Sequence, residues 1–318
     1  MSFPKSDHFD GTRFFNPGAE QAHGGIDVLR WMLSRKPEKW RAWTENEPQP
    51  APPERVGAGE LRVTFVGHAT VLIQFDGVNV VTDPVWSLRA SPVQFAGPKR
   101  RRPPGVAFET LPKIAVVLLS HNHYDHCDVH TLQRLAKRDQ PTIAVPLGLK
   151  PLVASCGYST IHELDWWESV EVAGLRLRSL PEQHFAARTP FDRNRTLWCG
   201  WEIASASAGT VQYHGDTAFG KHFDSIAERC VPPRLALLPI GAYQPEWFMG
   251  PVHMTPENAV KAHYILGAPQ SMAIHFGTFP LADDGEFDPP RRLARELEKR
   301  NDGTRFWWLQ PGEARSIE

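Results

Sequence analysis

The chain has 318 residues, with 35 basic and 36 acidic side chains and a formal net charge of −1 at pH 7. A charge balance so close to zero gives no general attraction to nucleic acid, so a nucleic-acid-binding protein is not expected. Hydrophobic residues make up 41% of the chain, which is enough to bury a sizeable core. No run of 18 apolar residues and no signal-peptide pattern occurs, so we expect a soluble protein or one that touches a membrane from outside.

The cysteines indicate the redox environment. Four of them are scattered singly, and no two stand at a zinc-finger spacing. A dense disulfide framework is therefore not expected, and reduced thiols in the cytoplasm fit this pattern.

Residues 1–60 are predicted to form an irregular arm that packs on one domain, residues 61–318. Residues 26–33 predict a short helix with Ile26, Leu29 and Leu33 on one face. We expect this face to pack against the main domain. The alternative is a helix whose apolar face touches a membrane.

From residue 61 the pattern changes to short strands, expected at 61–66, 71–75 and 78–82 and paired antiparallel because the turns between them are tight. A long loop rich in proline and arginine follows at 84–110, and loops of this length are usually functional. An apolar strand at 114–119 then leads through residues 120–128 into an amphipathic helix at 129–138, with Asp128 as its N-cap.

The rest of the chain repeats this order of strands followed by helices, which predicts two sheets with helices outside and a site at an edge between them. Helices are expected at 147–154, 256–266 and 290–300. Strands are expected at 142–145, 161–164, 170–173, 175–180, 197–204, 210–213, 235–239 and 271–276.

The stretch 121–126 (His-Asn-His-Tyr-Asp-His) brings three imidazoles and a carboxylate together within six residues. These side chains cannot all reach one tetrahedral ion, but they can be divided between two. His121 and His123 would then bind one ion, and Asp125 and His126 the other. Imidazole and carboxylate ligands suit zinc, and also iron or manganese. The stretch therefore predicts a dinuclear site, most simply with two Zn²⁺ ions.

Each ion needs further ligands from elsewhere in the chain. His184, Asp216 and His275 all stand at the ends of predicted strands. His214 competes with Asp216 for this role, although an aspartate has the advantage that it can bridge two ions. With Asp216 as the bridge, one ion would have His121, His123, His184 and Asp216, and the other Asp125, His126, Asp216 and His275.

Other polar residues are candidates for supporting roles. Asp83 follows a strand and is interpreted as an acceptor for the N–H of a ligand imidazole rather than as a simple turn residue. His253 could donate a proton to a leaving group. His68 is interpreted as structural. The basic run 99–102 lies in the long loop, from which it could contact a phosphate or an anionic headgroup.

Two ions about 3.5–4 Å apart would hold a bridging water and lower its pKa to about 7. The product is a hydroxide nucleophile at neutral pH next to two Lewis acids, and Asp125 and Asp216 are the predicted catalytic carboxylates. This arrangement predicts hydrolysis of an ester, lactone, amide or phosphodiester.

The stretch 121–126 resembles the signature loop of the metallo-β-lactamase superfamily. Over about residues 12–310, the chain also resembles N-acylphosphatidylethanolamine-hydrolysing phospholipase D and its bacterial relatives. The matching stretches are 15–17, 29–31, 67–70, 82–86, 89–92, 97–100, 120–128, 163–167, 239–243, 247–249 and 274–278.

This resemblance implies an α/β (α+β) fold, a four-layer αββα sandwich with a dinuclear metal site at the sheet edge. It assigns His184, Asp216 and His275 as ligands and places His253 near the site. The implied activity is zinc-dependent cleavage of N-acylphosphatidylethanolamine-like lipids to N-acylethanolamine and phosphatidic acid. The residue after His184 is Phe185, where animal members carry tryptophan. Acyl chains would follow an apolar path, expected along Trp86, Phe95, Phe185, Trp247, Phe248 and Met249.

Two other functions fit the same ligands. One is a lactonase acting on a phosphorylated sugar acid, with the run 99–102 holding the phosphate. The other is a non-catalytic, metal-stabilised protein at a membrane surface. The expected partner is thus a small-molecule or lipid phosphodiester. Peripheral membrane contact and a homodimer are compatible with this interpretation.

Overall fold

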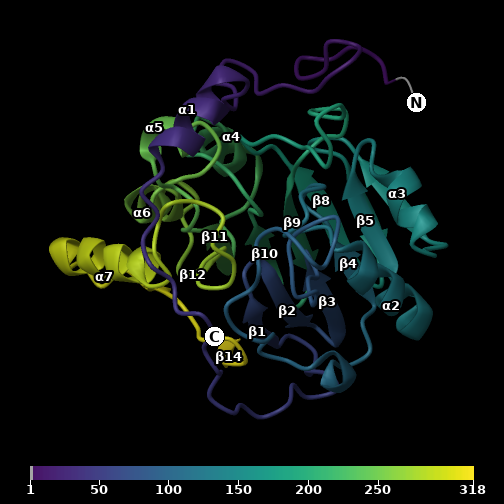
Figure 1. Cartoon of the computed structure of the whole chain (residues 1–318). Helices are drawn as coiled ribbons and strands as arrows, with labels where there is room; N and C mark the ends of the chain where they lie inside the picture. Colours follow the sequence, from purple (N-terminus) through teal and green to yellow (C-terminus); the bar gives the residue numbers. More distant parts are fainter. Residues whose placement is uncertain (1–2) are drawn as a thin grey trace.

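The computed structural model describes residues 3–318, which form two sheets of seven strands each (Figure 1). The first sheet has the order β14 (Ala314–Ile317), β1 (Leu61–Gly67), β2 (Thr70–Phe75), β3 (Val78–Thr82), β4 (Val116–Leu118), β5 (Thr142–Pro146) and β6 (Ile161–Leu164). The second has the order β13 (Phe306–Trp307), β12 (Ser271–Ile274), β11 (Leu235–Pro239), β10 (Gly209–Tyr213), β9 (Gly200–Ser205), β8 (Leu175–Leu180) and β7 (Ser169–Val172).

Each sheet has an antiparallel half and a parallel half. β1, β2 and β3 pair antiparallel, as the tight turns predicted, and Asp76 and Gly77 take positive φ angles of 52° and 80° in the turn between β2 and β3. From β3 to β6, and again from β10 to β13, neighbouring strands run parallel. The carboxyl ends of parallel strands meet at one edge, where ligands usually bind in such sheets.

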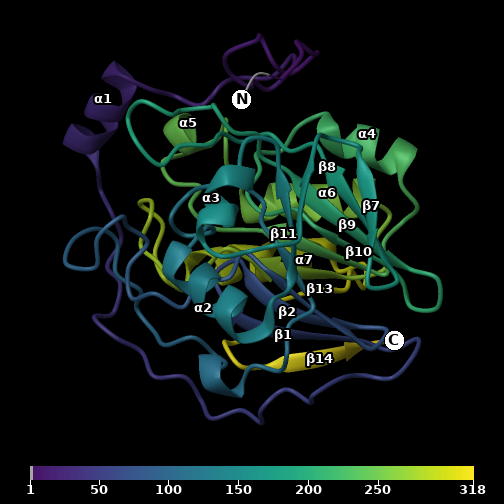
Figure 2. The same cartoon turned by 90° about the vertical axis from the view of Figure 1, so that its right-hand side faces the viewer.

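Helices cover the outer faces of the sandwich, as Figures 1 and 2 show. The first sheet is covered by α2 (Val129–Asp139) and α3 (Lys150–Ser155). The second is covered by α4 (His222–Arg229), α6 (Pro256–Ile265) and α7 (Asp288–Arg300). Between the sheets, Phe65 and Val71 pack in one core with Trp201 and Tyr213 of the second sheet, each at most 1% exposed. The predicted four-layer αββα sandwich is confirmed.

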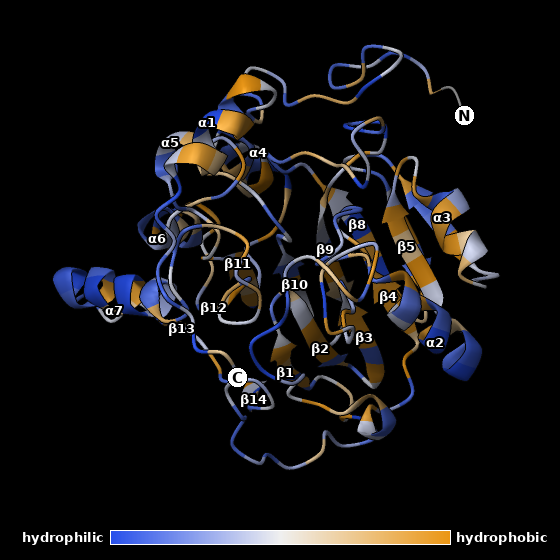
Figure 3. Cartoon of the chain, in the orientation of Figure 1, coloured by the Kyte–Doolittle hydropathy of each residue, from blue (hydrophilic) through white to orange (hydrophobic). Residues whose placement is uncertain are grey.

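The helix α1 (Ile26–Ser34) forms where it was predicted, but the buried face was predicted wrongly. Ile26, Leu29 and Leu33 are 82%, 54% and 81% exposed, and Figure 3 colours parts of α1 as hydrophobic. The helix instead contacts the domain through Trp31, whose ring stacks on Phe248 of α5 (Glu246–Met249) at 4.8 Å between centroids. Aromatic stacking on this one side decides how the short helix lies.

The loop 84–110 also differs from expectation. Asp128 precedes α2 but makes no side-chain cap; its carboxylate accepts hydrogen bonds from the N–H groups of Trp86 and Ser87.

Two members of the basic run 99–102 are buried. Arg100 donates to the carbonyl of Val85 at 2.9 Å, and Arg102 forms a 3.0 Å ion pair with Glu286. These arginines therefore hold the loop in place and are not free to bind a phosphate.

Salt bridges attach the arm to the rest of the chain. Arg35 pairs with Asp283 at 2.8 Å, and Arg41 pairs with Glu286 at 2.8 Å. The proposed division at residue 60 stays a prediction. No helix within residues 3–318 has both the length and the apolar character needed to cross a bilayer.

Candidate metal centre

Four loops bring the predicted metal ligands to one edge of the sandwich. Residues 121–126 lie between β4 and α2, His184 follows β8, Asp216 follows β10 and His275 follows β12. β8, β10 and β12 run in the same direction, because β8 and β10 are both antiparallel to β9 and β12 joins β10 through parallel pairs. Their carboxyl ends therefore deliver these side chains to the same place.

One group of imidazoles surrounds the first candidate position. His121 Nε2 lies 2.8 Å from His123 Nδ1, which lies 3.3 Å from His184 Nε2. Asp216 Oδ2 lies 3.7 Å from His184 Nε2 and 4.0 Å from His121 Nε2. The three ring nitrogens thus converge on one point beside a carboxylate oxygen.

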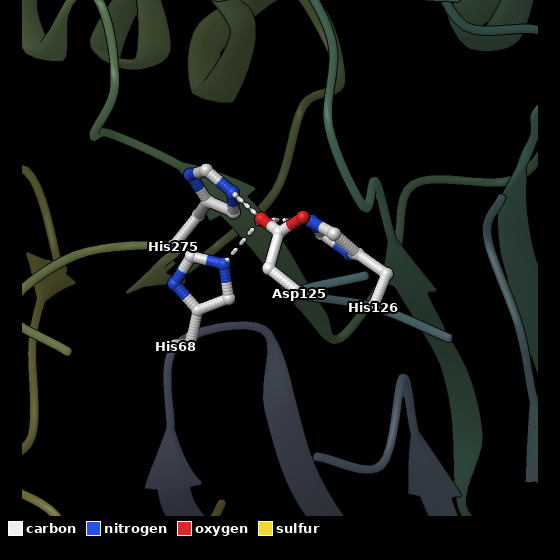
Figure 4. A group of neighbouring side chains, drawn as sticks. All are labelled: His68, Asp125, His126 and His275. Carbon is white, nitrogen blue, oxygen red and sulfur yellow. Dashed lines mark hydrogen bonds and ion pairs between the residues drawn. The ribbon is translucent and has the colours of Figure 1, made fainter. Parts of the chain in front are cut away.

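A second group of side chains also contacts Asp216. His126 Nε2 is 3.1 Å from Asp216 Oδ2, and His275 Nε2 is 3.1 Å from Asp216 Oδ1. Asp125 Oδ2 lies 3.3 Å from His126 Nε2 and 3.4 Å from His275 Nε2 (Figure 4). Asp216 is therefore the carboxylate shared by the two groups.

The chemistry of these buried atoms fits metal ions. His126 Nε2 and Asp216 Oδ1 are buried and make no hydrogen bond within residues 3–318, although charged groups surround them. Burial and neighbouring imidazoles lower the pKa of His123 to about 3, and burial lowers that of His184 to about 4. These rings are neutral at pH 7, which is the form that binds metal. Despite burial, the neighbouring carboxylates raise the pKa of His126 well above its usual range and that of His275 to about 9, so a metal ion bound there would displace a proton. The donor set of imidazoles and carboxylates fits metal ions.

Asp83 lies behind the candidate ligand His126. His126 Nδ1 donates to Asp83 Oδ2 at 2.6 Å, and the hydroxyl groups of Ser120 and Tyr213 donate to the same oxygen at 2.5 Å. A carboxylate in this position fixes the orientation and tautomer of the ring. Ser120 and Tyr213 were not predicted; the buried strand-end position of Tyr213 gave no sign of this contact.

His68 was interpreted as structural, but the structure places it against the candidate ligands. Its Nε2 lies 2.9 Å from Asp125 Oδ2, and its ring centroid is 4.0 Å from that of His275. His68, Asp83 and His275 all take positive φ angles, of 58°, 34° and 60°. Strained backbone of this kind is concentrated at functional sites.

The competition between His214 and Asp216 is resolved by the turn between them. His214 Nδ1 lies 2.7 Å from Oε1 of Glu182, which is not one of the candidate ligands. Gly215 has a φ of 50°, and a Cβ there would lie 2.6 Å from Ser120 Cβ. Only glycine fits this close approach, which turns Asp216 toward the cluster.

A cavity of about 320 Å³ opens beside the cluster, and His123, Asp125, Asp216, His253 and His275 line its polar end. The N-terminal arm, Arg193 and several apolar side chains form the remaining walls: Ala22, His23, Val28, Trp31, Phe185, Phe248, Met249, Val252 and Leu281. Of the six side chains expected to line an acyl path, Phe185, Phe248 and Met249 line this cavity.

The other three side chains expected along the acyl path, Trp86, Phe95 and Trp247, do not line this cavity. Trp86 packs against Phe108 with ring centroids 5.7 Å apart, and Phe95 is 84% exposed. Trp247 lies under the guanidinium of Arg30, 4.9 Å from its ring centroid. We did not predict that Val28 and Trp31 of the arm line the cavity, because the face predicted to be buried was that of Ile26, Leu29 and Leu33.

A two-sheet sandwich with a histidine and aspartate cluster at its edge defines a class of metal-dependent hydrolases. Residues 78–276 match the beta-lactamase superfamily domain. A metallo hydrolase from the archaeon Ignicoccus hospitalis has the same fold, with a TM-score of 0.61 and 21% identity over 81% of this chain and 99% of that one.

The particular family follows from two curated relatives. The chain is 40% identical over 268 residues to N-acyl-phosphatidylethanolamine-hydrolyzing phospholipase D 1 of Caenorhabditis elegans, covering 80% of this chain and 75% of the relative. It is 32% identical over 239 residues to the mitochondrial enzyme of that name from Saccharomyces cerevisiae, covering 72% of this chain and 50% of the relative. The chain therefore belongs to the N-acyl-phosphatidylethanolamine-hydrolysing phospholipase D family of the beta-lactamase superfamily, as a metal-dependent hydrolase.

Proposed function

We propose that this hydrolase is a zinc-dependent phosphodiesterase of the phospholipase D type. It would cleave N-acylphosphatidylethanolamine-like lipids to N-acylethanolamine and phosphatidic acid. The observation that carries this proposal is the cavity of about 320 Å³, which joins the metal-binding cluster to an apolar wall and a guanidinium. The names of the nematode and yeast relatives support the same substrate class.

The ligand sets follow from the two groups of side chains. We assign one ion to His121, His123, His184 and Asp216, and the other to Asp125, His126, Asp216 and His275. Zinc suits these nitrogen and carboxylate ligands, with iron or manganese as alternatives. When bound, such ions lower the pKa of a coordinated water to about 7 and polarise a phosphoryl oxygen. Asp125 and Asp216 hold the reaction centre together, since each contacts both His126 and His275.

Arg193 favours an anionic substrate. Its Nη2 donates to the carbonyls of Ala22 and His23 at 2.6 and 2.8 Å, and its guanidinium lies over Phe185. No carboxylate within residues 3–318 forms an ion pair with it. Burial lowers its pKa, but an arginine stays charged at neutral pH. A fixed positive charge without a partner in the cavity wall would attract the phosphodiester group.

His253 lies beside both groups, with its ring centroid 5.2 Å from that of His184 and 5.4 Å from that of His275. Burial lowers the pKa of His253 well below its usual range, so its ring is neutral at pH 7. Its Nδ1 is buried without a hydrogen bond to residues 3–318. We assign His253 to hydrogen bonding with the leaving oxygen, since a neutral imidazole gives up a proton far less readily than an imidazolium.

The substrate would come from a lipid surface. Val28 and Trp31 of α1 line the cavity, while Ile26, Leu29, Met32 and Leu33 on its other sides are 82%, 54%, 62% and 81% exposed. An apolar face next to a cavity entrance is typical of helices that lie in the membrane interface. We propose that α1 rests on the bilayer from which the lipid enters.

A lactonase acting on a phosphorylated sugar acid is the second candidate, because Arg193 could also hold its phosphate. The basic run 99–102 does not favour it, since Arg100 and Arg102 have internal partners. Chain-length dependence distinguishes the two functions. If kcat/KM rises with acyl length for lipid phosphodiesters, the lipid assignment holds; if turnover is confined to sugar lactones, it is wrong.

A further inference from the structure

Arg188 joins two loops of the candidate metal centre, and no step of the proposed reaction uses it. Its Nη1 donates hydrogen bonds to the carbonyl of Asn122 at 2.9 Å and to the carbonyl of Cys127 at 2.8 Å. Asn122 and Cys127 are both buried, and they directly precede and follow the segment 123–126, which carries three candidate ligands. One guanidinium therefore holds both ends of this ligand segment.

The ring of Tyr124 forms a second connection between Arg188 and the ligand segment. The guanidinium carbon of Arg188 lies over this ring, 4.0 Å from its centroid, and the Tyr124 hydroxyl donates to the backbone carbonyl of Arg188 at 2.9 Å. A cation over an aromatic ring adds a favourable interaction to the hydrogen bonds. Arg188 thus contacts the ligand segment through both its side chain and its backbone.

The backbone of Arg188 is itself held in a turn. Arg188 lies on the loop that follows β8, shortly after the candidate ligand His184. Asp192 Oδ1 accepts hydrogen bonds from the N–H groups of Arg188 and Thr189 at 3.0 and 2.8 Å. The guanidinium therefore extends from an ordered turn, and it links the loop of His184 to the ligand segment 123–126.

Arg188 contacts the loops and not the space where a substrate would bind. Phe185 and Arg193 of the same loop line the cavity of about 320 Å³ beside the cluster, whereas Arg188 does not. An arginine stays charged at any physiological pH, so both carbonyls face a charge-assisted donor. Hydrogen bonds of this kind are roughly twice as strong as those between neutral groups, which suits a side chain that holds backbone in place.

We propose that Arg188 is a positioning residue for the metal centre. It fixes the segment 123–126 against the loop of His184, so that ligands from the two loops meet the ions in one geometry. This inference rests on the ligand sets proposed above. Without Arg188, every candidate ligand remains in the chain, but the segment that carries three of them is free to move. Loss of such support around the ligands typically lowers metal affinity about 10- to 100-fold.

The variant Arg188→Met tests this role in the whole chain. Methionine is also long and unbranched, but it has neither the positive charge nor the N–H donors of arginine. Zinc affinity is measured by competition with a chromophoric chelator, and the zinc Kd should rise about tenfold or more. The visible absorption bands of the Co²⁺-substituted chain report the coordination geometry, and they should change in position or intensity in Arg188→Met.

Arg134→Met is the matched control. Arg134 is also partly buried and also lies over an aromatic ring, 3.7 Å from the centroid of Phe108, but it pairs with Glu109 and not with the ligand segment. Its replacement should change the zinc Kd less than about threefold. Arg188→Lys keeps a charge and donors, so its zinc Kd should lie between those of the unchanged chain and Arg188→Met. Urea unfolding of the metal-free chains measures any general loss of stability.

The outcomes separate this inference from the proposed function. Equal zinc affinity and equal Co²⁺ bands in Arg188→Met and Arg134→Met would overturn the positioning role and leave the ligand sets intact. Unfolding of the metal-free chain in Arg188→Met alone would also overturn it, because general stability would then explain the loss of metal. An unchanged chain that binds no zinc would overturn the proposed function together with this inference.

Discussion

His68 Nε2 lies 2.9 Å from Asp125 Oδ2, although the two residues are 57 positions apart in the chain. The same oxygen faces His126 and His275, so His68 helps to set the position of a carboxylate at the centre of the cluster. The backbone carbonyl of His68 also accepts a hydrogen bond from the N–H of His275 at 2.8 Å. His68 therefore contacts two candidate ligands from outside the histidine-rich loop.

Replacing His68 should weaken metal binding. In His68→Ala, Asp125 loses its partner, and metal affinity should fall about 10- to 100-fold, as is typical when a residue that orients a ligand is lost. Elemental analysis after dialysis against a graded chelator series measures this. His263 is the control, because it is also largely buried but bonds Ser271 at 2.8 Å. Equal metal retention in His68→Ala and His263→Gln would contradict the role given to His68.

Removal of Asp216 should affect both ions at once. Asp216→Ala deletes the carboxylate shared by the two groups, so both sites should lose metal and kcat/KM should fall by at least about 10³-fold. Asp83→Asn keeps every candidate ligand, so metal content and kcat/KM should fall less than in Asp216→Ala. Metal content and turnover are measured on the same preparations. If activity in cells survives in Asp216→Ala, a non-catalytic role becomes the better account.

Arg193 should discriminate between anionic and neutral substrates. Arg193→Gln removes a guanidinium charge that forms no ion pair with a carboxylate of residues 3–318. KM for a phosphodiester should therefore rise about 10- to 100-fold, while hydrolysis of a neutral ester should change little. Arg195→Gln, an exposed neighbour, serves as the control. Equal losses on both substrates would mean that Arg193 only holds Ala22 and His23 in place.

The exposed face of α1 should control access to bilayers. The double variant Ile26→Ser/Leu33→Ser removes two side chains that are 82% and 81% exposed, so the fold should be unaffected. Vesicle binding should fall about tenfold or more, whereas turnover of a soluble short-chain substrate should stay the same. Val231→Ser is the matched control, since Val231 is 60% exposed outside this helix. If vesicle binding is unaffected in the double variant, another surface contacts the lipid.

Local patterns predicted much of the structure. The three tight strands, the two-sheet sandwich and the concentration of ligands at 121–126 all follow from neighbouring residues in the sequence. His68 was missed because its partner Asp125 lies on another loop and nothing near Gly67 signals the contact. The φ of 50° at Gly215 decides whether His214 or Asp216 faces the cluster. The spacing of residues in the sequence does not reveal this backbone angle.

The arm and the long loop were harder to predict, for physical reasons. Periodicity on α1 groups Ile26, Leu29 and Leu33 correctly, but it does not say which side of the helix finds a partner. The stack of Trp31 on Phe248 decides that question. Similarly, the basic run looks solvated in sequence, yet Arg100 and Arg102 find acceptors inside the fold.

Turnover of N-acylphosphatidylethanolamine by metal-analysed protein tests the central claim most directly. Preparations with graded zinc content would be assayed for phosphatidic acid and N-acylethanolamine, with a phosphorylated sugar lactone assayed in parallel. We predict that both lipid products appear in equal amounts and rise with zinc content toward two ions per chain. A preparation with both ions bound that opens the lactone and leaves the lipid intact would contradict the account.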